Sequence, residues 1–511
     1  MMGTALADTN GGIARALARD EWQDLARKLD WRFSYVSEQD AFPEPISGKP
    51  WLTQDDWAGW DEPFRISFAE YVRAQSDKEA AVAAVADALG RAAERERLAP
   101  EWNSGLKLHA ALLPLAEFAA VVGNLRAVRF GRDSAWRSMA LFGALDELRH
   151  TQIPLRLMHP YLAADAQYDW THRFYHSNDW VAIAARHCFD ELLLLADPIE
   201  FAVATNFVFE TGFTNLQFTA LTALCDSVGD RLLEQMLASI QTDEARHAQI
   251  GPAVLEILVQ HDRAYAQYLL DKWFWRSFLL FAVATGFTMD YLTPVERRTQ
   301  SFKEFMHEWV LTQFVDSLAR YGLQRPWYWA QFEQALDYYH HMVYASAYSY
   351  RASVWFHLAL PGPAERDWLR SKYPQSFPAL EPVWENITQE WGNSDAGVDL
   401  AVHGTAIPTF CSMCQIVLCG GTPAHNSVCQ CRHEGATYTF CSEPCRWIFR
   451  QDPARYARHK DVVKRVLAGE APGNLIAFLT QYSGLSFATW GKDAYGGDYA
   501  WLRRGPRSGQ E

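Results

Sequence analysis

The 511-residue sequence contains no Gly-x-Gly triplet, and so lacks the fingerprint of a bound dinucleotide cofactor. It also lacks a long apolar run, because its longest uncharged apolar stretch, 277–289, is too short to span a bilayer. The polar, glycine-rich start, 1–18, has no apolar centre like that of a signal peptide. Acidic residues outnumber Lys and Arg, 61 to 47, and the net charge of −14 argues against nucleic-acid or anionic-membrane partners. We therefore expect a cytoplasmic protein that binds neither.

What the chain does contain is two near-copies of one pentapeptide. Asp-Glu-Leu-Arg-His occupies 146–150, and Asp-Glu-Ala-Arg-His occupies 243–247. On a helix, the Glu and His of each copy are three residues apart and point to the same face. Each copy also has an upstream glutamate in an apolar run: Glu117 is thirty residues before Glu147, and Glu210 is thirty-four before Glu244.

These separations predict two antiparallel helix hairpins. The two acids of a hairpin reach the same level only if the turn lies midway, and turn-forming residues occur there, at 131–133 and 226–230. Two hairpins make a four-helix bundle with four glutamates and two histidines inside, as in di-iron carboxylate proteins. Four carboxylates would neutralise two ferrous ions, whereas without metal the acids in apolar runs would be costly to bury. The predicted ligands of the two Fe ions are Glu117, Glu147, His150, Glu210, Glu244 and His247.

Residues beside the expected ligands suggest supporting roles. Asp146 and Asp243 precede ligand glutamates, and we expect them to accept hydrogen bonds from the ring N–H groups of the metal-bound histidines. Arg149 and Arg246 are expected to pair with those aspartates, with exposed salt bridges as the alternative.

The space beside the metal is expected to be apolar and to suit a hydrocarbon. Thr214 lies one turn after Glu210, where its hydroxyl would reach the metal, although mere packing is equally consistent with the spacing. The predicted pocket residues are Leu113, Ala116, Ala120, Phe189, Thr205, Phe209 and Phe218.

Composition divides the chain into four parts. We expect a disordered start (1–20), a Trp- and Pro-rich arm with a helix (21–100), a ferritin-like helical domain (101–395) and a Cys-rich domain with a tail (396–511). The predicted fold class is mainly α: a ferritin-like four-helix bundle with extra helices, plus a small α+β module. His340 and His341 have no acid at ligand spacing, and a packed or interface role is expected for them.

Seven of the nine cysteines follow residue 410, which suggests metal ligands in a reducing compartment rather than disulfides. Two close pairs would supply four thiolates to a structural Zn ion: Cys411 and Cys414, then Cys441 and Cys445. Free buried cysteines are the alternative. Three further cysteines between the pairs could replace a ligand: Cys419, Cys429 and Cys431.

Several of these segments resemble the hydroxylase alpha subunit of bacterial multicomponent monooxygenases, in the branch that acts on toluene, benzene and alkenes such as isoprene and propene. The segments are 175–178, 209–218, 239–249 and 300–306. The resemblance extends over about residues 20–500, and all six expected di-iron ligands match in type and spacing.

The resemblance implies a catalytic subunit that inserts one oxygen atom from O₂ into a small hydrocarbon. Aromatic hydroxylation is the first expectation, with alkene epoxidation or phenol hydroxylation as alternatives. The implied partners are beta and gamma subunits in a dimer of heterotrimers, an effector protein, a Rieske-type ferredoxin and an NADH-dependent flavin reductase. The missing Gly-x-Gly agrees with electrons arriving from another polypeptide. The family assigns Thr214, Asn215 and Gln241 to oxygen activation and effector-linked rearrangement, and Leu113 to gating the pocket.

Four residues depart from the family pattern. Pro114 and Pro154 lie inside expected ligand helices, where each removes a backbone hydrogen bond and should produce a kink. Thr205 and Asn206 are more polar than expected one turn before Glu210. A ribonucleotide-reductase-like radical protein is a remote alternative, but it would need a tyrosine about one turn past His150, where Pro154 stands.

Overall fold

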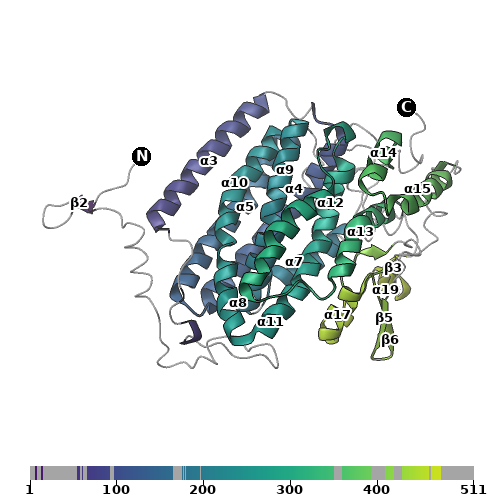
Figure 1. Ribbon diagram of the computed structural model, residues 1–511. Helices are drawn as coiled ribbons and strands as arrows, with labels where there is room; N and C mark the ends of the chain where they lie inside the picture. The colour runs from purple at the N-terminus through teal and green to yellow at the C-terminus, as the bar shows by residue number, and fades with distance from the viewer. Residues whose placement is uncertain are drawn as a thin grey trace.

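The structure is a computed structural model of the chain. It describes residues 6–7, 13–14, 55–57, 60, 66–91, 97–164, 175, 178, 180–195, 197–349, 360–392, 409–418, 429–459 and 462–472. These residues are mainly helical, and the long helices stand side by side (Figure 1). The predicted mainly α fold class is confirmed.

Two helical hairpins form the centre of the molecule. The first consists of α4 (Pro100–Phe130) and α5 (Ser134–Ala164). The second consists of a π-helix, η4 (Ala202–Thr214), its continuation α9 (Asn215–Val228), and α10 (Arg231–His247). Both turns fall where the sequence predicts them. Gly229 ends α9 with φ +85°, a left-handed conformation that favours glycine, and Asp230 then caps α10 by accepting from the Leu233 amide.

Further helices surround the two hairpins. Helix α3 (Phe68–Arg91) packs on α10 and α5 from outside, while α11 (Ile250–Phe281) packs on η4 (Figure 1). The others are η1 (Asp55–Trp57), α7 (Trp180–Leu193), α8 (Pro198–Phe201), η5 (Ala282–Gly286), η6 (Thr288–Leu292), η7 (Val295–Arg297), α12 (Phe302–Phe305), η8 (Met306–Phe314), η9 (Val315–Tyr321), α13 (Trp329–Ser349), α14 (Pro363–Lys372) and α15 (Phe377–Gly392).

The ligand helices run through both unexpected prolines. Pro114 and Pro154 are buried within continuous helices. Within the segments that the structure describes, no single helix is long and apolar enough to cross a bilayer. The bent pair Arg231–Leu292 and Val295–Tyr321 would be long and apolar enough only if its two parts are counted together.

A smaller module of short strands and helices packs beside the bundle (Figure 1). Strand β3 (Thr409–Phe410) pairs antiparallel with β4 (Val417–Leu418), and β5 (Cys429–His433) pairs antiparallel with β6 (Ala436–Phe440). Helices α17 (Glu443–Gln451), α18 (Pro453–Ala457) and α19 (Val462–Leu467) follow. Near the start of the chain, β1 (Leu6–Ala7) pairs with β2 (Ile13–Ala14); the rest of 1–20 lies outside the described residues.

The π-helix η4 and α11 approach each other closely at Gly251. A Cβ atom at this position would lie 2.3 Å from the Phe207 backbone nitrogen. Backbone atoms cannot move aside as the end of a side chain can, so only glycine fits. This contact brings η4, which carries Glu210, directly against α11.

We predict that Gly251→Ala destabilises the protein by about 1–3 kcal/mol, the usual cost of overpacking a core. Thermal unfolding of the purified protein would measure the effect. Gly105→Ala in α4 is the matched control, because its Cβ would lie 3.6 Å from the nearest atoms, in Leu292 and Thr288. It should leave the melting temperature unchanged or raise it slightly. Equal melting temperatures for the two variants would contradict the close approach.

Candidate metal centre

The central helices bring the six predicted iron ligands together in the core. Atoms of Glu117, Glu147, His150 and Glu244 lie within 4.8 Å of one another, and Glu147, Glu210 and His247 form a second such group. All six side chains are buried. Because Glu147 belongs to both groups, the arrangement suits two neighbouring cations that share a carboxylate.

Each histidine directs one ring nitrogen toward this cluster. His150 Nδ1 lies 3.3 Å from Glu147 Oε2 and 3.0 Å from Glu244 Oε1, and His247 Nδ1 lies 3.2 Å from Glu147 Oε1. Despite these short distances, neither Nδ1 atom nor Glu147 Oε2 makes a hydrogen bond of acceptable geometry with any described residue. Buried polar atoms without partners are costly. Bound cations would satisfy them, and imidazole and carboxylate donors are suited to ferrous iron.

The charges in the cluster also favour cations. Burial raises the pKa of Glu117 well above its usual range, and burial with the neighbouring Glu244 raises the pKa of Glu210 to about 8. Burial alone would lower the pKa of His150 and His247, but the surrounding carboxylates outweigh it and raise both pKa values. Without metal the cluster therefore retains protons, which metal binding would displace.

The two aspartates support the histidines in a crossed arrangement. His150 Nε2 lies 3.3 Å from Asp243 Oδ2, and His247 Nε2 lies 3.0 Å from Asp146 Oδ2. Each aspartate thus contacts the histidine of the other pentapeptide. Because an ionised carboxylate only accepts hydrogen bonds, each Nε2 carries a proton and each Nδ1 is left for a cation.

The arginines of the two pentapeptides lie on the same aspartates. Arg149 Nη1 donates to Asp243 Oδ2 at 2.8 Å, and Arg246 donates to both Asp146 and Asp243. Both arginines are buried and contact the aspartates, although Arg149 also pairs with Glu79, whose side chain is 40% exposed.

Helix α3 adds four hydrogen bonds, from three polar residues, that the sequence reading missed. Tyr71 and Gln75 donate to Asp146, and Gln75 and Lys78 donate to Asp243. A polar stripe at i, i+4 and i+7 was the only signal in the sequence, and it resembles the solvent face of any helix.

A cavity of about 110 Å³ opens beside the cluster. Four of the predicted ligands border it: Glu117, Glu147, Glu210 and Glu244. All seven residues expected to line the pocket do line it, namely Leu113, Ala116, Ala120, Phe189, Thr205, Phe209 and Phe218. The remaining wall is mostly aliphatic. The geometry therefore joins a set of metal ligands to an apolar space.

The three residues expected to assist oxygen activation lie in different places. Thr214 lines the cavity, and its buried hydroxyl has no partner among the described residues. Asn215 donates to the Glu244 backbone oxygen at 3.4 Å, and Gln241 donates to Thr219 at 3.0 Å. Neither of these two residues lines the cavity.

Two further polar residues bear on the site. Asn206, noted in the sequence as a departure from the family pattern, donates from Nδ2 to Glu210 Oε2 at 2.8 Å. Asn206 therefore hydrogen-bonds a predicted metal ligand and does not line the pocket. His109, which the sequence reading missed, lines the cavity two turns of α4 before Glu117.

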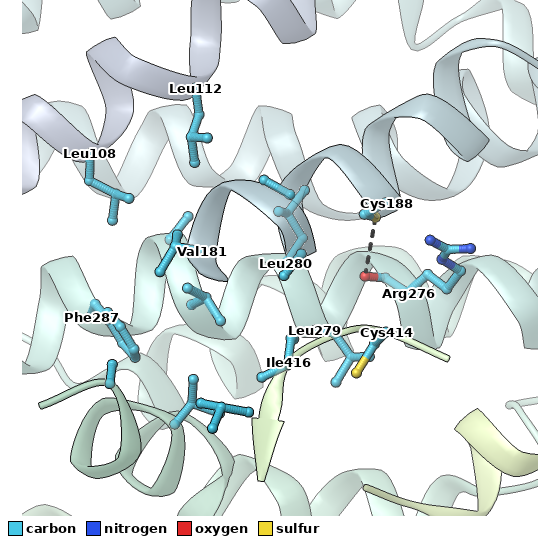
Figure 2. A pocket seen from close by; sticks show the side chains of 17 residues that line it. Leu108, Leu112, Val181, Cys188, Arg276, Leu279, Leu280, Phe287, Cys414 and Ile416 are labelled. Atoms are coloured by element: carbon cyan, nitrogen blue, oxygen red, sulfur yellow. Dashed lines mark hydrogen bonds between the residues drawn. The ribbon is translucent and has the colours of Figure 1, made fainter. Parts of the chain in front are cut away.

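A second cavity, of about 50 Å³, lies between the bundle and the smaller module. Figure 2 shows its wall, to which Leu108 and Leu112 of α4 and Leu280 of α11 contribute opposite Ile416. Those three leucines also line the first cavity, so the two spaces are neighbours.

In the smaller module, the four predicted zinc ligands lie together: Cys411, Cys414, Cys441 and Cys445 have sulfur atoms within 4.8 Å of one another. Cys441 Sγ lies 3.4 Å from Cys445 Sγ and 3.9 Å from Cys414 Sγ. Cys429 and Cys431 lie outside this cluster, and Cys419 lies outside the described residues. Four sulfurs at these distances suit a tetrahedral metal.

An acid does lie beside His340 in the fold, although none stands at ligand spacing in the sequence. Asp290, fifty residues before His340, lies 2.7 Å from its Nε2 atom. Its oxygens also accept from Tyr373 and from the Phe302 amide, and His341 lies 2.6 Å from the Tyr291 hydroxyl. The group is fully buried and largely hydrogen-bonded, as expected for residues packed in the core.

Comparisons with known proteins agree with this architecture. A family model described as methane/phenol/alkene hydroxylase matches residues 31–262, and one described as a YHS domain matches residues 425–460. The alpha subunit of the oxygenase component of an alkene monooxygenase system from Xanthobacter autotrophicus is 40% identical, over 95% of this chain and 98% of that protein.

Two phenol-oxidising proteins are also similar. The oxygenase component of phenol 2-monooxygenase from Pseudomonas sp. is 29% identical over 91% of this chain and 89% of its own length. The crystal structure of xenon-pressurised phenol hydroxylase from Pseudomonas sp. OX1 matches with a TM-score of 0.83 and 27% identity, over 96% of this chain and 99% of that one.

The bundle and its Glu/His cluster have the architecture of di-iron carboxylate proteins. The chain belongs to the methane, phenol and alkene hydroxylase family, whose members are monooxygenases with a carboxylate-bridged di-iron centre. The resemblance found in the sequence is thereby confirmed.

We predict that Glu210→Ala and His247→Ala each abolish iron binding, because each removes a donor from the second group of ligands. Elemental analysis of the purified protein would measure iron per chain. Glu200→Ala is the control: Glu200 is also buried, but it pairs with Lys272 at 3.2 Å. That variant should lose stability and keep its iron. Full iron content in either ligand variant would contradict the assignment.

For the cysteine cluster, we predict that replacing Cys411 and Cys414 with Ser removes zinc and lowers the melting temperature while iron content stays near normal. The matched control is Cys431→Ser, in the same module but outside the cluster, which should keep zinc. Elemental analysis and thermal unfolding would measure both effects. Retention of zinc by the double variant would exclude these sulfurs as its ligands.

Proposed function

We propose that this chain is the catalytic alpha subunit of a multicomponent monooxygenase that epoxidises a small alkene. The single observation that carries the proposal is the Glu/His cluster bordering an apolar cavity. The substrate class is supported by the 40% identity to an alkene monooxygenase subunit over nearly the whole chain.

Cavity size supports an alkene over an arene. Apolar cavities of about 150 Å³ accommodate benzene in other proteins. The cavity here is smaller, about 110 Å³. It suits a hydrocarbon of a few carbons better than a substituted ring, so the alkene alternative replaces aromatic hydroxylation as the first choice.

The residues of the chain divide the work of the reaction. The four glutamates and two histidines would hold two irons, which supply the electron-transfer chemistry that activates O₂. The aliphatic wall excludes water and holds the alkene beside the metal ligands. The Thr214 hydroxyl, at the edge of the cavity, can donate or accept a hydrogen bond there. Asp146 and Asp243 fix the orientation of the histidine rings.

Other proteins would have to complete the system. The relatives are oxygenase components of larger systems, as their names state. Since the sequence has no Gly-x-Gly, we infer that NADH is oxidised by a separate flavin reductase and that a Rieske-type ferredoxin delivers the electrons. Beta and gamma subunits and an effector protein complete the proposed assembly.

A phenol-type activity is the second candidate, and His109 is the observation that favours it. Its Nδ1 atom lies 2.8 Å from the Gly105 carbonyl oxygen and must donate to it. Burial lowers the pKa of His109, so the ring is neutral and Nε2 is an acceptor. Nε2 is buried without a partner among the described residues, where a substrate hydroxyl could donate to it.

We predict that propene or isoprene gives the highest kcat/KM, ahead of toluene and phenol. The measurement is NADH-dependent O₂ uptake, with product identification, by the complex reconstituted with its electron-transfer partners. His109→Leu should lower the ratio of phenol to propene kcat/KM by about tenfold, the effect of losing one buried hydrogen bond. A wild-type preference for phenol would reverse the order of the two candidates, and no oxygenated product from any substrate would reject both.

A further inference from the structure

Helix α3 lies outside the ligand-bearing helices, yet its inner face reaches the aspartates that hold the histidines (Figure 1). Tyr71, Gln75 and Lys78 are spaced four and three residues apart, so they share one side of the helix. Val82, one turn further along the same side, is buried. This face of α3 therefore packs on the protein, with Gln75 and Lys78 partly buried.

Gln75 connects the two aspartates directly. Its Nε2 atom donates to Asp146 Oδ1 at 2.8 Å and to Asp243 Oδ1 at 2.9 Å. An amide nitrogen carries two hydrogens and can serve both oxygens at once. Since each aspartate holds a histidine from a different helix, a single side chain fixes the relative position of both imidazoles.

Lys78 brings a positive charge to the same place. Its Nζ atom lies 2.5 Å from Asp243 Oδ1, while Asp243 Oδ2 faces His150. The Lys78 side chain is 24% exposed and that of Asp243 is 0% exposed, so water screens this pair only in part. Its charge is therefore felt by the buried ligands.

The charges around the ligands show why this lysine matters. Asp146 and Asp243 are balanced by Arg149 and Arg246, all of which are buried. Lys78 adds one positive charge to that balanced layer. The opposing charge is Glu79, which binds Arg149 at 2.9 Å but is 40% exposed and therefore more strongly screened.

We propose that the Tyr71–Gln75–Lys78 face of α3 positions the metal-bound histidines, and that Lys78 raises the reduction potential of the iron pair. Reduction adds negative charge to the centre, and a nearby positive charge stabilises the reduced form. The proposal rests on the proposed function, because it presumes that the cluster holds iron.

The experiment compares Lys78→Met and Lys78→Gln with Lys78→Arg and the wild type. Each purified oxygenase component is first analysed for iron and then titrated against redox mediators, with the iron oxidation state followed by electron paramagnetic resonance. Both uncharged variants should keep iron and shift to a lower midpoint potential, whereas Lys78→Arg should match the wild type. At a fixed applied potential, the ratio of reduced to oxidised centre should fall on the order of tenfold, the size expected for losing one unit charge beside a partly buried site.

Lys303→Met is the matched control. Lys303 also forms a 2.5 Å pair with a carboxylate, that of Asp337, and its side chain is 25% exposed, but the pair lies between α12 and α13. Its midpoint potential should equal that of the wild type. An unchanged potential in iron-loaded Lys78→Met, or an equal shift in the control, would overturn the role of Lys78.

Gln75→Leu tests the positioning role separately. Loss of both hydrogen bonds should release iron to a chelator roughly tenfold faster, the usual scale for residues that orient metal ligands. A wild-type release rate would overturn the positioning role. Wild-type protein without iron would instead reject the proposed function, so the two failures can be told apart.

Discussion

The structure depends on four carboxylates buried in an apolar bundle. Each ionised carboxylate costs several kcal/mol to bury unless an opposite charge compensates it. Here Glu117, Glu147, Glu210 and Glu244 come from four different helical segments and border one cavity. Two cations would neutralise them, and protons on the acids and imidazoles partly do so otherwise. Packing of the bundle and occupation of the cluster are consequently coupled, as in other proteins whose metal sites form only on folding.

The crossed contacts between the pentapeptides explain why the repeat is needed as a whole. Asp146 contacts His247, and Asp243 contacts His150. In the same crossed way, Arg149 donates to Asp243 and Arg246 donates to Asp146. Neither copy is complete alone, because the aspartate that orients each histidine comes from the other helix. Helix α3 then joins the two aspartates from outside. The site is thus built in three successive layers: the Glu/His cluster, the Asp/Arg pairs that contact its histidines, and the face of α3 that contacts the aspartates.

The spacing of residues in the sequence was sufficient to predict the bundle and to place its expected ligands together, because helix geometry converts residue separation into position. The two acids of each hairpin are thirty or thirty-four residues apart, so they lie level only if the chain turns near Gly131 and Gly229. Both turns are found there. Contacts between distant segments were beyond such reasoning. The acid beside His340 comes from Asp290, and the polar stripe on α3 is indistinguishable in sequence from a solvated face. Cavity volume likewise depends on how side chains pack, which periodicity does not encode.

The smaller module packs against the helical domain and encloses one of its cavities. Cys414, Ile416 and Val417 line the second cavity, and the Trp275 indole of α11 donates to Cys445 Sγ at 3.3 Å. The cysteine cluster therefore lies directly behind the wall of that cavity. A metal held by four sulfurs would keep this wall rigid without taking part in chemistry. Because both cavities share leucines of α4 and α11, the fold of the module bears on the space beside the Glu/His cluster.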